Sequence, residues 1–223
     1  MRSSPLVLPA QSFQTVEKAV LAGLLLFSAM LFFIIYTLDV SVSNNLTSEQ
    51  GLFEVMSKFL WVVLAVLCVV KLGFRKWGIL TALLSLIFAA READLHKAFT
   101  ADSIFKTNYY KMDIPFAEKF WGGLVGIACI IVLVWVLFSC CVYLYRTKAW
   151  RQAWGRLTIL AIAMVFFTKV CDRLESVLYD DFQVQISQLQ AVICNMFEEG
   201  FEMLLPILFA IALLCWCRRV RGS

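Results

Sequence analysis

Six long apolar runs, separated by short polar segments, dominate the pattern of this chain. Each run has about 20 residues or more, the length that an α-helix needs to cross the roughly 30 Å hydrocarbon core of a bilayer. The runs do not alternate polar and apolar positions, as the strands of a membrane barrel would. The pattern predicts an all-α integral membrane bundle of six transmembrane helices, forming one domain over residues 1–223. The predicted spans are residues 19–38, 52–70, 77–96, 120–145, 155–177 and 191–216.

Lys and Arg collect in alternate connecting segments, which predicts the orientation of the chain. They occur before the first run, in the second and fourth connections and after the sixth run, as at Lys18, Lys76, Arg146 and Arg219. Cytoplasmic segments carry an excess of Lys and Arg, so we expect the N- and C-termini to be cytoplasmic. Of the sixteen acidic residues, only Glu17 lies on that side.

The outer connections are then residues 39–51, 97–119 and 178–190. The middle connection is the longest, and it carries Tyr109 and Tyr110. We expect this loop to fold over the outer mouth of the bundle.

The composition agrees with a membrane protein. The chain is 61% hydrophobic, and its mean hydropathy is +0.81. These values exceed the range of soluble domains and leave no room for a soluble domain beside six spans. The eight cysteines lie within or beside apolar runs, and no C-x-x-C motif is present, which argues against thiol redox chemistry. The composition implies membrane lipids as partners, and no nucleic acid.

Charged residues enter four of the six runs at a common depth. The third run is purely apolar only over residues 77–90, roughly 21 Å at 1.5 Å per residue, so Arg91 enters the outer leaflet. Counted from the cytoplasmic ends of their runs, Lys58, Lys169 and Glu202 reach a similar level. An isolated charge at this depth costs several kcal/mol. We therefore expect these side chains to face one another or a water-filled cavity.

The candidate ligand-binding residues are the charged side chains at this level. They combine cations, which suit a phosphate or another small anion, with carboxylates. The predicted site comprises Lys58, Arg91, Glu92, Lys169, Asp172, Arg173, Glu198, Glu199 and Glu202. Helical spacing places Lys169 with Asp172, and Glu198 with Glu202, on shared faces. Pro206 cannot donate to the carbonyl of Glu202 and predicts a bend there.

Four interpretations of this charged cluster stay open. The leading one is a pocket that binds a lipid headgroup or small polar ligand from the outer side. The second is a structural or complex-assembly subunit whose buried charges form only an inter-helix ion-pair network. The third is a metal-dependent membrane hydrolase, for which His96 and Glu92 are weak metal candidates. The fourth is proton or ion transport through the paired carboxylates.

Some properties are not decided by these residues. His96 is the only histidine, so membrane hydrolases that need three zinc-binding histidines are excluded. The pattern names no cofactor and leaves open whether the protein is an enzyme. Another protein, or a second copy of the chain, also stays open as a partner in the membrane.

The outer halves of three runs carry a family resemblance. The stretch Glu198-Glu199-Gly200-Phe201-Glu202-Met203 is similar to the last helix of a bacterial multi-spanning membrane protein family without a known activity. The segments Arg91-Glu92-x-Asp94 and Asp172-Arg173-x-x-Glu175 share this resemblance. It implies a location in the inner (plasma) membrane of a bacterium.

Reporter fusions test the predicted orientation. A periplasmic phosphatase fused after Ser223 should be inactive, because that end is expected in the cytoplasm, where the enzyme does not mature. The same phosphatase inserted after Asp113, in the long outer connection, should be active. Phosphatase activity in the fusion at Ser223 would contradict the six-span arrangement.

Overall fold

The structure, a computed structural model, describes residues 10–37, 40–48, 51–95, 104 and 107–222. Of the described residues 89% are helical and none forms a strand, which confirms the predicted all-α class. The chain divides into two compact units, Met1–Ser57 with Lys148–Ser223 and Lys58–Thr147. A single domain over the whole chain stays a prediction.

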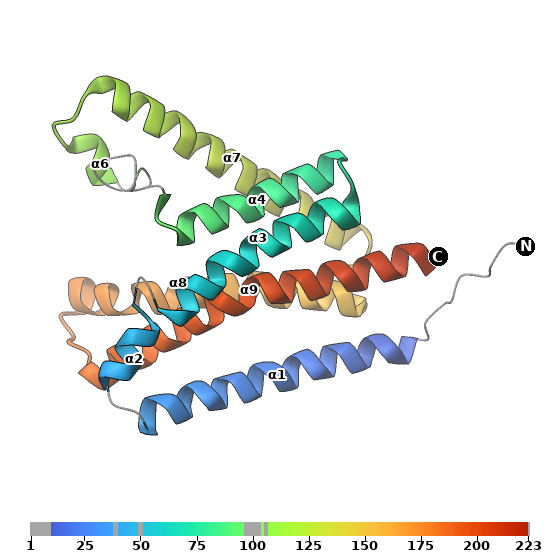
Figure 1. Ribbon diagram of the computed structural model, residues 1–223, viewed down its shortest axis with the longest axis horizontal. Helices are drawn as coiled ribbons and strands as arrows, with labels where there is room; N and C mark the ends of the chain where they lie inside the picture. Colours follow the sequence, from blue (N-terminus) through green and yellow to red (C-terminus); the bar gives the residue numbers. More distant parts are fainter. Residues whose placement is uncertain (1–9, 38–39, 49–50, 96–103, 105–106, 223) are drawn as a thin grey trace, which may run out of the picture. The chain divides into compact units, whose positions relative to one another are not determined.

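Every predicted span corresponds to a long helix. These helices are α1 (Ala10–Thr37), α3 (Leu52–Leu72), α4 (Lys76–Glu92), α7 (Phe116–Arg146), α8 (Ala153–Phe182) and α9 (Gln188–Gly222) (Figure 1). Among the described residues, three further short elements were not predicted: α2 (Val40–Leu46), α6 (Thr107–Lys111) and the 3-10 helix η1 (Ala149–Arg151).

Four helices in the described part of the chain are long and apolar enough to cross a membrane. Their candidate spans are Gln14–Thr37, Leu52–Leu72, Phe116–Arg146 and Gln188–Val220. Helix α4 has 17 residues, about 26 Å, which is shorter than the hydrocarbon core. Helix α8 has 30 residues, and charges occupy its second half. The structure therefore supports a helical membrane protein, and six spans with cytoplasmic termini stay a prediction.

The helix ends differ from the ends of the apolar runs. Helix α4 ends at Glu92 rather than at residue 96, and Asp94 follows in the left-handed region with φ 49°. Helix α8 continues past residue 177 to Phe182, and Gln183 then adopts φ 54°. A helix needs apolar side chains only where it meets hydrocarbon, so polar turns extend it beyond the apolar run.

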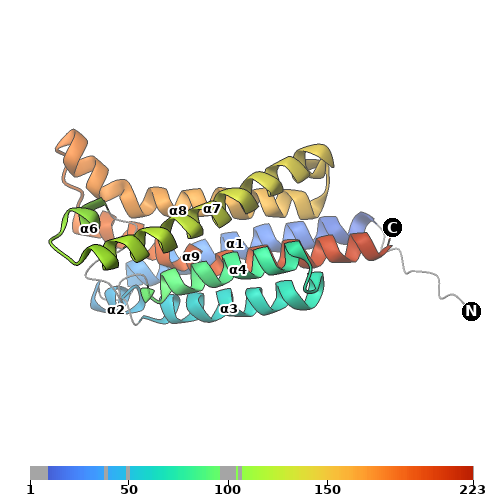
Figure 2. The same ribbon diagram turned by 90° about the horizontal axis from the view of Figure 1, so that it is seen from above.

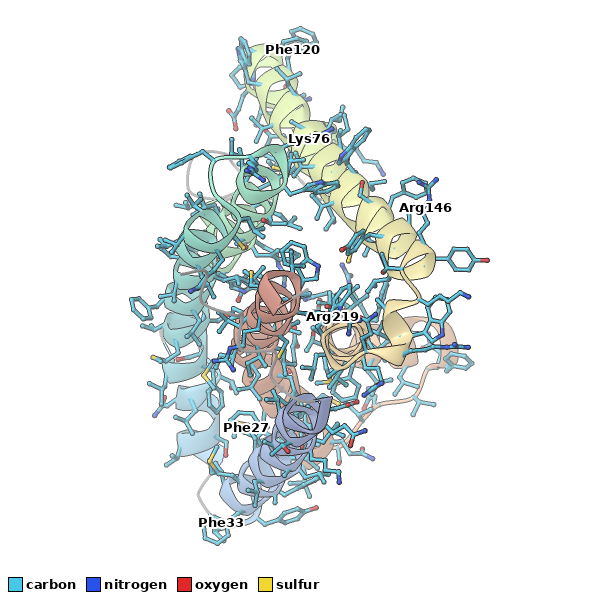
Figure 3. The ribbon with its side chains drawn as sticks, turned by 90° about the vertical axis from the view of Figure 1, so that its right-hand side faces the viewer. Phe27, Phe33, Lys76, Phe120, Arg146 and Arg219 are labelled. Atoms are coloured by element: carbon cyan, nitrogen blue, oxygen red, sulfur yellow. The ribbon has the colours of Figure 1, made fainter. Side chains whose placement is uncertain are left out.

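In the first unit, α1 and α8 pack against α9, and α8 and α9 form an antiparallel hairpin (Figure 1). Phe201 of α9 is buried, and the centre of its ring lies 5.9 Å from that of Phe27 in α1 and 5.7 Å from that of Phe167 in α8. Figure 3 labels Phe27 on α1. A Cβ on Gly200 would lie 3.0 Å from a methyl carbon of Leu31, so the glycine allows α1 to approach closely. This packing sets the face that α9 turns toward α8.

A bidentate ion pair also joins α1 to the start of α8. The Nε and Nη2 atoms of Arg156 donate to the two carboxylate oxygens of Glu17, at 2.6 and 2.5 Å. This fork-to-fork geometry fixes the relative orientation of the two side chains. Sequence reasoning missed the pair, although Glu17 stood out as the one acid among the predicted cytoplasmic segments.

In the second unit, α4 and α7 run antiparallel (Figure 2). Trp61 of α3 stacks on Phe88 of α4, with ring centres 4.6 Å apart. The ammonium nitrogen of Lys76 lies 5.1 Å from the ring centre of Trp135, within the range of a cation–π contact. This contact aligns the start of α4 with the second half of α7, and Figure 3 labels Lys76 there.

The segment before α7 folds back onto the start of that helix. Tyr109 of α6 is fully buried, and its hydroxyl donates to the backbone carbonyl of Glu118 at 3.1 Å. Burial raises the pKa of the Tyr109 phenol. The hydroxyl of Tyr110 donates to the carbonyl of Ile104 at 2.8 Å. A Cβ on Gly122 would lie 2.9 Å from the Tyr109 oxygen and 3.1 Å from a methyl carbon of Ile104, so this glycine makes room for the segment.

Two adjacent glycines of α7 offer a matched test of this packing. Gly123→Ala meets only an ordinary contact of 3.5 Å with Tyr110, so it should gain up to about 1 kcal/mol from better helix propensity. Gly122→Ala should lose that gain or destabilise the protein, because the buried Tyr109 ring must move. Thermal unfolding in detergent measures both changes. Equal stabilisation by the two substitutions would contradict the close packing at Gly122.

Candidate functional site

Lys169 of α8 lies among three carboxylates of the first unit. Its ammonium nitrogen is 2.9 Å from Oε1 of Glu202, 3.3 Å from Oδ2 of Asp172 and 3.8 Å from Oε1 of Glu198. The side chain of Glu202 is 6% exposed, whereas that of Lys169 is 36% exposed. The depth count placed Arg91, Lys169 and Glu202 at one level and expected these charges to face one another or a water-filled cavity, and the structure contains the pair of Lys169 with Glu202.

Helix geometry explains why these side chains meet. Glu198 and Glu202 are four residues apart on α9, and Lys169 and Asp172 are three residues apart on α8, so each pair shares a face. Because α8 and α9 are antiparallel neighbours, the two faces meet at one level. Helix α9 continues without a break through the buried Pro206, which has no backbone N–H to donate to the Glu202 carbonyl. The Glu202 carboxylate is itself buried, and a nearby cation is strongly favoured in such an interior.

The other predicted site residues of α8 and α9 flank this group. Arg173 is exposed on α8, one turn beyond Lys169, and Glu199 is half-buried on α9. The ion pairs of Lys169 with Asp172, Glu198 and Glu202 therefore form the centre of the charged group in the first unit. We refer to Lys169 and these three carboxylates as the Lys169 cluster.

The remaining predicted site residues belong to the second unit. Lys58 is half-buried on α3. Arg91 and Glu92 are neighbours at the end of α4, with a guanidinium nitrogen 3.8 Å from a carboxylate oxygen. Glu92 is buried, and Arg91 is half-buried. A binding role for any of the predicted residues stays a prediction.

The metal hypothesis gains no support from the described residues. In that part of the chain, no group of three or more His, Cys, Asp or Glu side chains is arranged to hold a metal ion. His96, the weak metal candidate named with Glu92, lies outside the described residues.

A cavity of about 600 Å³ lies between α4 and α7 of the second unit. Of its fourteen lining residues, twelve are uncharged, and the other two are Arg91 from α4 and Glu118 from α7. Ile104, from the segment folded over α7, also lines it. The volume is typical of a site for one drug-sized ligand. We call this cavity the α4–α7 pocket.

The two charged residues lie near the same level of the α4–α7 pocket. Lys76 and Trp135 are in contact, so they give a common level from which both helices can be counted. Arg91 follows Lys76 by fifteen residues, roughly 22 Å, and Glu118 precedes Trp135 by seventeen, roughly 25 Å. Beyond Glu118, the lining residues of α7 are uncharged as far as Leu133. The pocket is therefore amphipathic, with charge at one end and a long apolar floor.

Sequence reasoning predicted Arg91 but missed Glu118. Glu118 was assigned to the long outer connection, whereas α7 begins at Phe116 and places it in the first helical turn. Glu118, Gly122, Val125 and Cys129 all line the pocket. Their spacing of four, three and four residues places them on one helix face, which is the signal that could have found them.

Neither a known protein family, nor a curated protein, nor a solved structure matches this chain.

Substitutions at Lys169 and Glu202 test whether the Lys169 cluster stabilises the hairpin. Lys169→Met should destabilise the protein more than Glu202→Gln does. Lys169→Met removes three ion pairs, whereas Glu202→Gln leaves Lys169 paired with Asp172 and Glu198. We expect a loss of about 1–3 kcal/mol for Lys169→Met. Breaking a fully buried ion pair costs about 3–5 kcal/mol. We expect a smaller loss here because the Lys169 side chain is 36% exposed.

Unfolding of the single and double variants in detergent measures this coupling. The double variant should lose less than the sum of the two single losses, since each substitution removes the other's partner. Asp172→Asn is the control, because Asp172 is 40% exposed and its loss should cost less than about 0.5 kcal/mol. Additive losses at Lys169 and Glu202 would show that the pair contributes nothing to stability.

Proposed function

We propose that this protein is a multi-spanning protein of a bacterial inner membrane that binds a membrane phospholipid in the α4–α7 pocket. The lipid phosphate contacts Arg91, and an acyl chain lies on the apolar floor between the two helices. The observation that carries this proposal is the lining of the pocket, with twelve uncharged residues and a charged end. It develops the hypothesis of a lipid-headgroup site, with Arg91 as the predicted residue that enters the pocket.

The chemistry of Arg91 favours a phosphate. A guanidinium group presents several N–H donors in a plane and forms two parallel hydrogen bonds with a phosphate or carboxylate. Apart from Arg91 and Glu118, every lining residue is uncharged, so a soluble polar ligand would leave most of its surface without partners there. An acyl chain satisfies the apolar floor, and only a headgroup is needed at the charged end.

The dimensions also favour a lipid. The pocket lining on α7 runs from Glu118 to Leu133, roughly 22 Å at 1.5 Å per residue. This exceeds the roughly 15 Å thickness of one leaflet of the hydrocarbon core. A cavity of about 600 Å³ accommodates one acyl chain beneath its headgroup rather than an entire two-chain lipid. The second chain would remain in the surrounding bilayer.

The charge pattern of the connections supplies the membrane side. With both termini in the cytoplasm, Lys76 lies at the inner surface and Arg91 in the outer leaflet. The bound lipid would then come from the outer leaflet. The inner membrane of a bacterium follows from the resemblance of three charged segments to bacterial membrane proteins.

A structural role is the second candidate, and the Lys169 cluster favours it. All three carboxylates near Lys169 come from its own hairpin, so the group forms ion pairs without any ligand. We infer that this cluster fixes the register of α8 and α9, and that the lipid site belongs to the other unit.

Arg91→Gln tests the proposed function. The substitution keeps a polar side chain but removes the charge, and it should weaken phosphatidylglycerol binding by about 1.5–3 kcal/mol, roughly ten- to hundredfold in Kd. Native mass spectrometry of the detergent-purified protein, titrated with this lipid, measures the change.

Arg146→Gln is the matched control, because Arg146 is exposed at the far end of α7 and does not line the pocket. It should leave phospholipid binding within about threefold of the unchanged protein. Val125→Trp, which fills the pocket, should displace the lipid without changing Arg91. Unaltered binding in both Arg91→Gln and Val125→Trp would refute a lipid site between α4 and α7.

A further inference from the structure

We propose that the α4–α7 pocket selects phospholipids whose headgroup carries an ammonium group, with Arg91 binding the phosphate and Glu118 the ammonium. This inference rests on the proposed function and names the class of lipid. It assigns a specificity-determining role to Glu118, which the charge pattern of the sequence did not single out.

The placement of two opposite charges in one otherwise uncharged cavity carries this inference. Arg91 comes from α4 and Glu118 from α7, so the charges approach from two different walls of the pocket. Counted from the contact of Lys76 with Trp135, they lie fifteen and seventeen residues along their helices, which is about the same level. The charged end of the pocket thus has a guanidinium on its α4 side, 3.8 Å from the Glu92 carboxylate, and a carboxylate on its α7 side.

A phosphoethanolamine headgroup has the complementary arrangement. Its phosphate is negative, and a short two-carbon link connects it to a primary ammonium group with three N–H donors. The phosphate suits the bidentate guanidinium of Arg91, and the ammonium suits the carboxylate of Glu118. A phosphatidylglycerol headgroup offers the same phosphate but no cation, so it places no positive charge near the Glu118 carboxylate. The carboxylate then acts against anionic headgroups as well as in favour of ammonium-bearing ones.

The position of Glu118 is fixed by its surroundings. An acid in the first turn of α7 is stabilised by the helix dipole, which accounts for a carboxylate at this place in the sequence. The helix dipole alone does not explain why Glu118 lines the α4–α7 pocket. The buried hydroxyl of Tyr109 donates to the Glu118 carbonyl, and the close contact of Tyr109 with Gly122 holds the next turn of the same face. The carboxylate is therefore attached to a well-packed turn at the charged end of the pocket.

Competition between two lipids tests this selectivity. The detergent-purified protein is titrated in native mass spectrometry with phosphatidylethanolamine and with phosphatidylglycerol that carry identical acyl chains. We expect the unchanged protein to bind phosphatidylethanolamine at least about tenfold more tightly. Glu118→Gln should weaken phosphatidylethanolamine by about tenfold and leave phosphatidylglycerol unchanged or tighter. Glu118→Asp keeps the charge and should keep the preference.

The outcomes separate this inference from the proposed function. Equal affinity of the unchanged protein for the two lipids, or the same preference in Glu118→Gln, would overturn the role of Glu118. If Arg91→Gln still weakens both lipids in that case, the lipid site stands and only its selectivity is lost. If Arg91→Gln weakens neither lipid, the proposed function fails as well. The comparison in the unchanged protein needs no variant, so it decides the question even if Glu118→Gln does not fold.

Discussion

A charged side chain that is partly or fully buried is stabilised by an opposite charge nearby, and both units of the structure contain such pairs. In the first unit Lys169 lies within 4 Å of Glu202, Glu198 and Asp172. The packing of Phe201 and Gly200 sets the face of α9 that makes this possible. The α8–α9 hairpin is therefore held by apolar packing on one face of α9 and by ion pairs on another.

In the second unit we propose that the charged residues form a ligand site instead of fixing the register of two helices. Arg91 and Glu118 enter a cavity whose other lining residues are uncharged, from two helices and at about the same level. An amphipathic molecule with a charged head and an apolar tail matches this arrangement, and the surrounding membrane consists of such molecules. The closely packed segment around Tyr109 and Gly122 shapes the charged end of the pocket. Lipid binding is therefore the function that the pocket supports best.

Much of the fold could be predicted from the sequence, because long apolar runs have few alternatives to a helix in a membrane. Depth counting also brought Lys169 and Glu202 to one level, since helical rise is constant. The predicted span was too long at α4, because this helix contains Arg91 and ends at Glu92, so Asp94 follows the helix although it was assigned to the span. The short helices α2 and α6 were missed, because polar connecting segments carry no apolar periodicity.

The pocket could not be predicted in the same way. Its shape depends on the fold-back of Tyr109 onto Gly122, a contact between a segment outside the apolar runs and a helix face. Glu118 was hidden for a related reason, since the apolar run of α7 begins after it although the helix begins before it. A search for apolar spans does not find a polar residue that lies in the first turn of a helix, before the apolar run begins.

A high-resolution cryo-electron microscopy structure of the protein in nanodiscs that contain phosphatidylethanolamine tests the central claim most directly. We predict lipid density between α4 and α7, with the phosphate within about 4 Å of the Arg91 guanidinium, the distance of an ion pair. We also predict an acyl chain along the face of α7 that includes Val125 and Cys129. A pocket closed by its own side chains, or a bound lipid whose headgroup lies away from Arg91, would contradict the account.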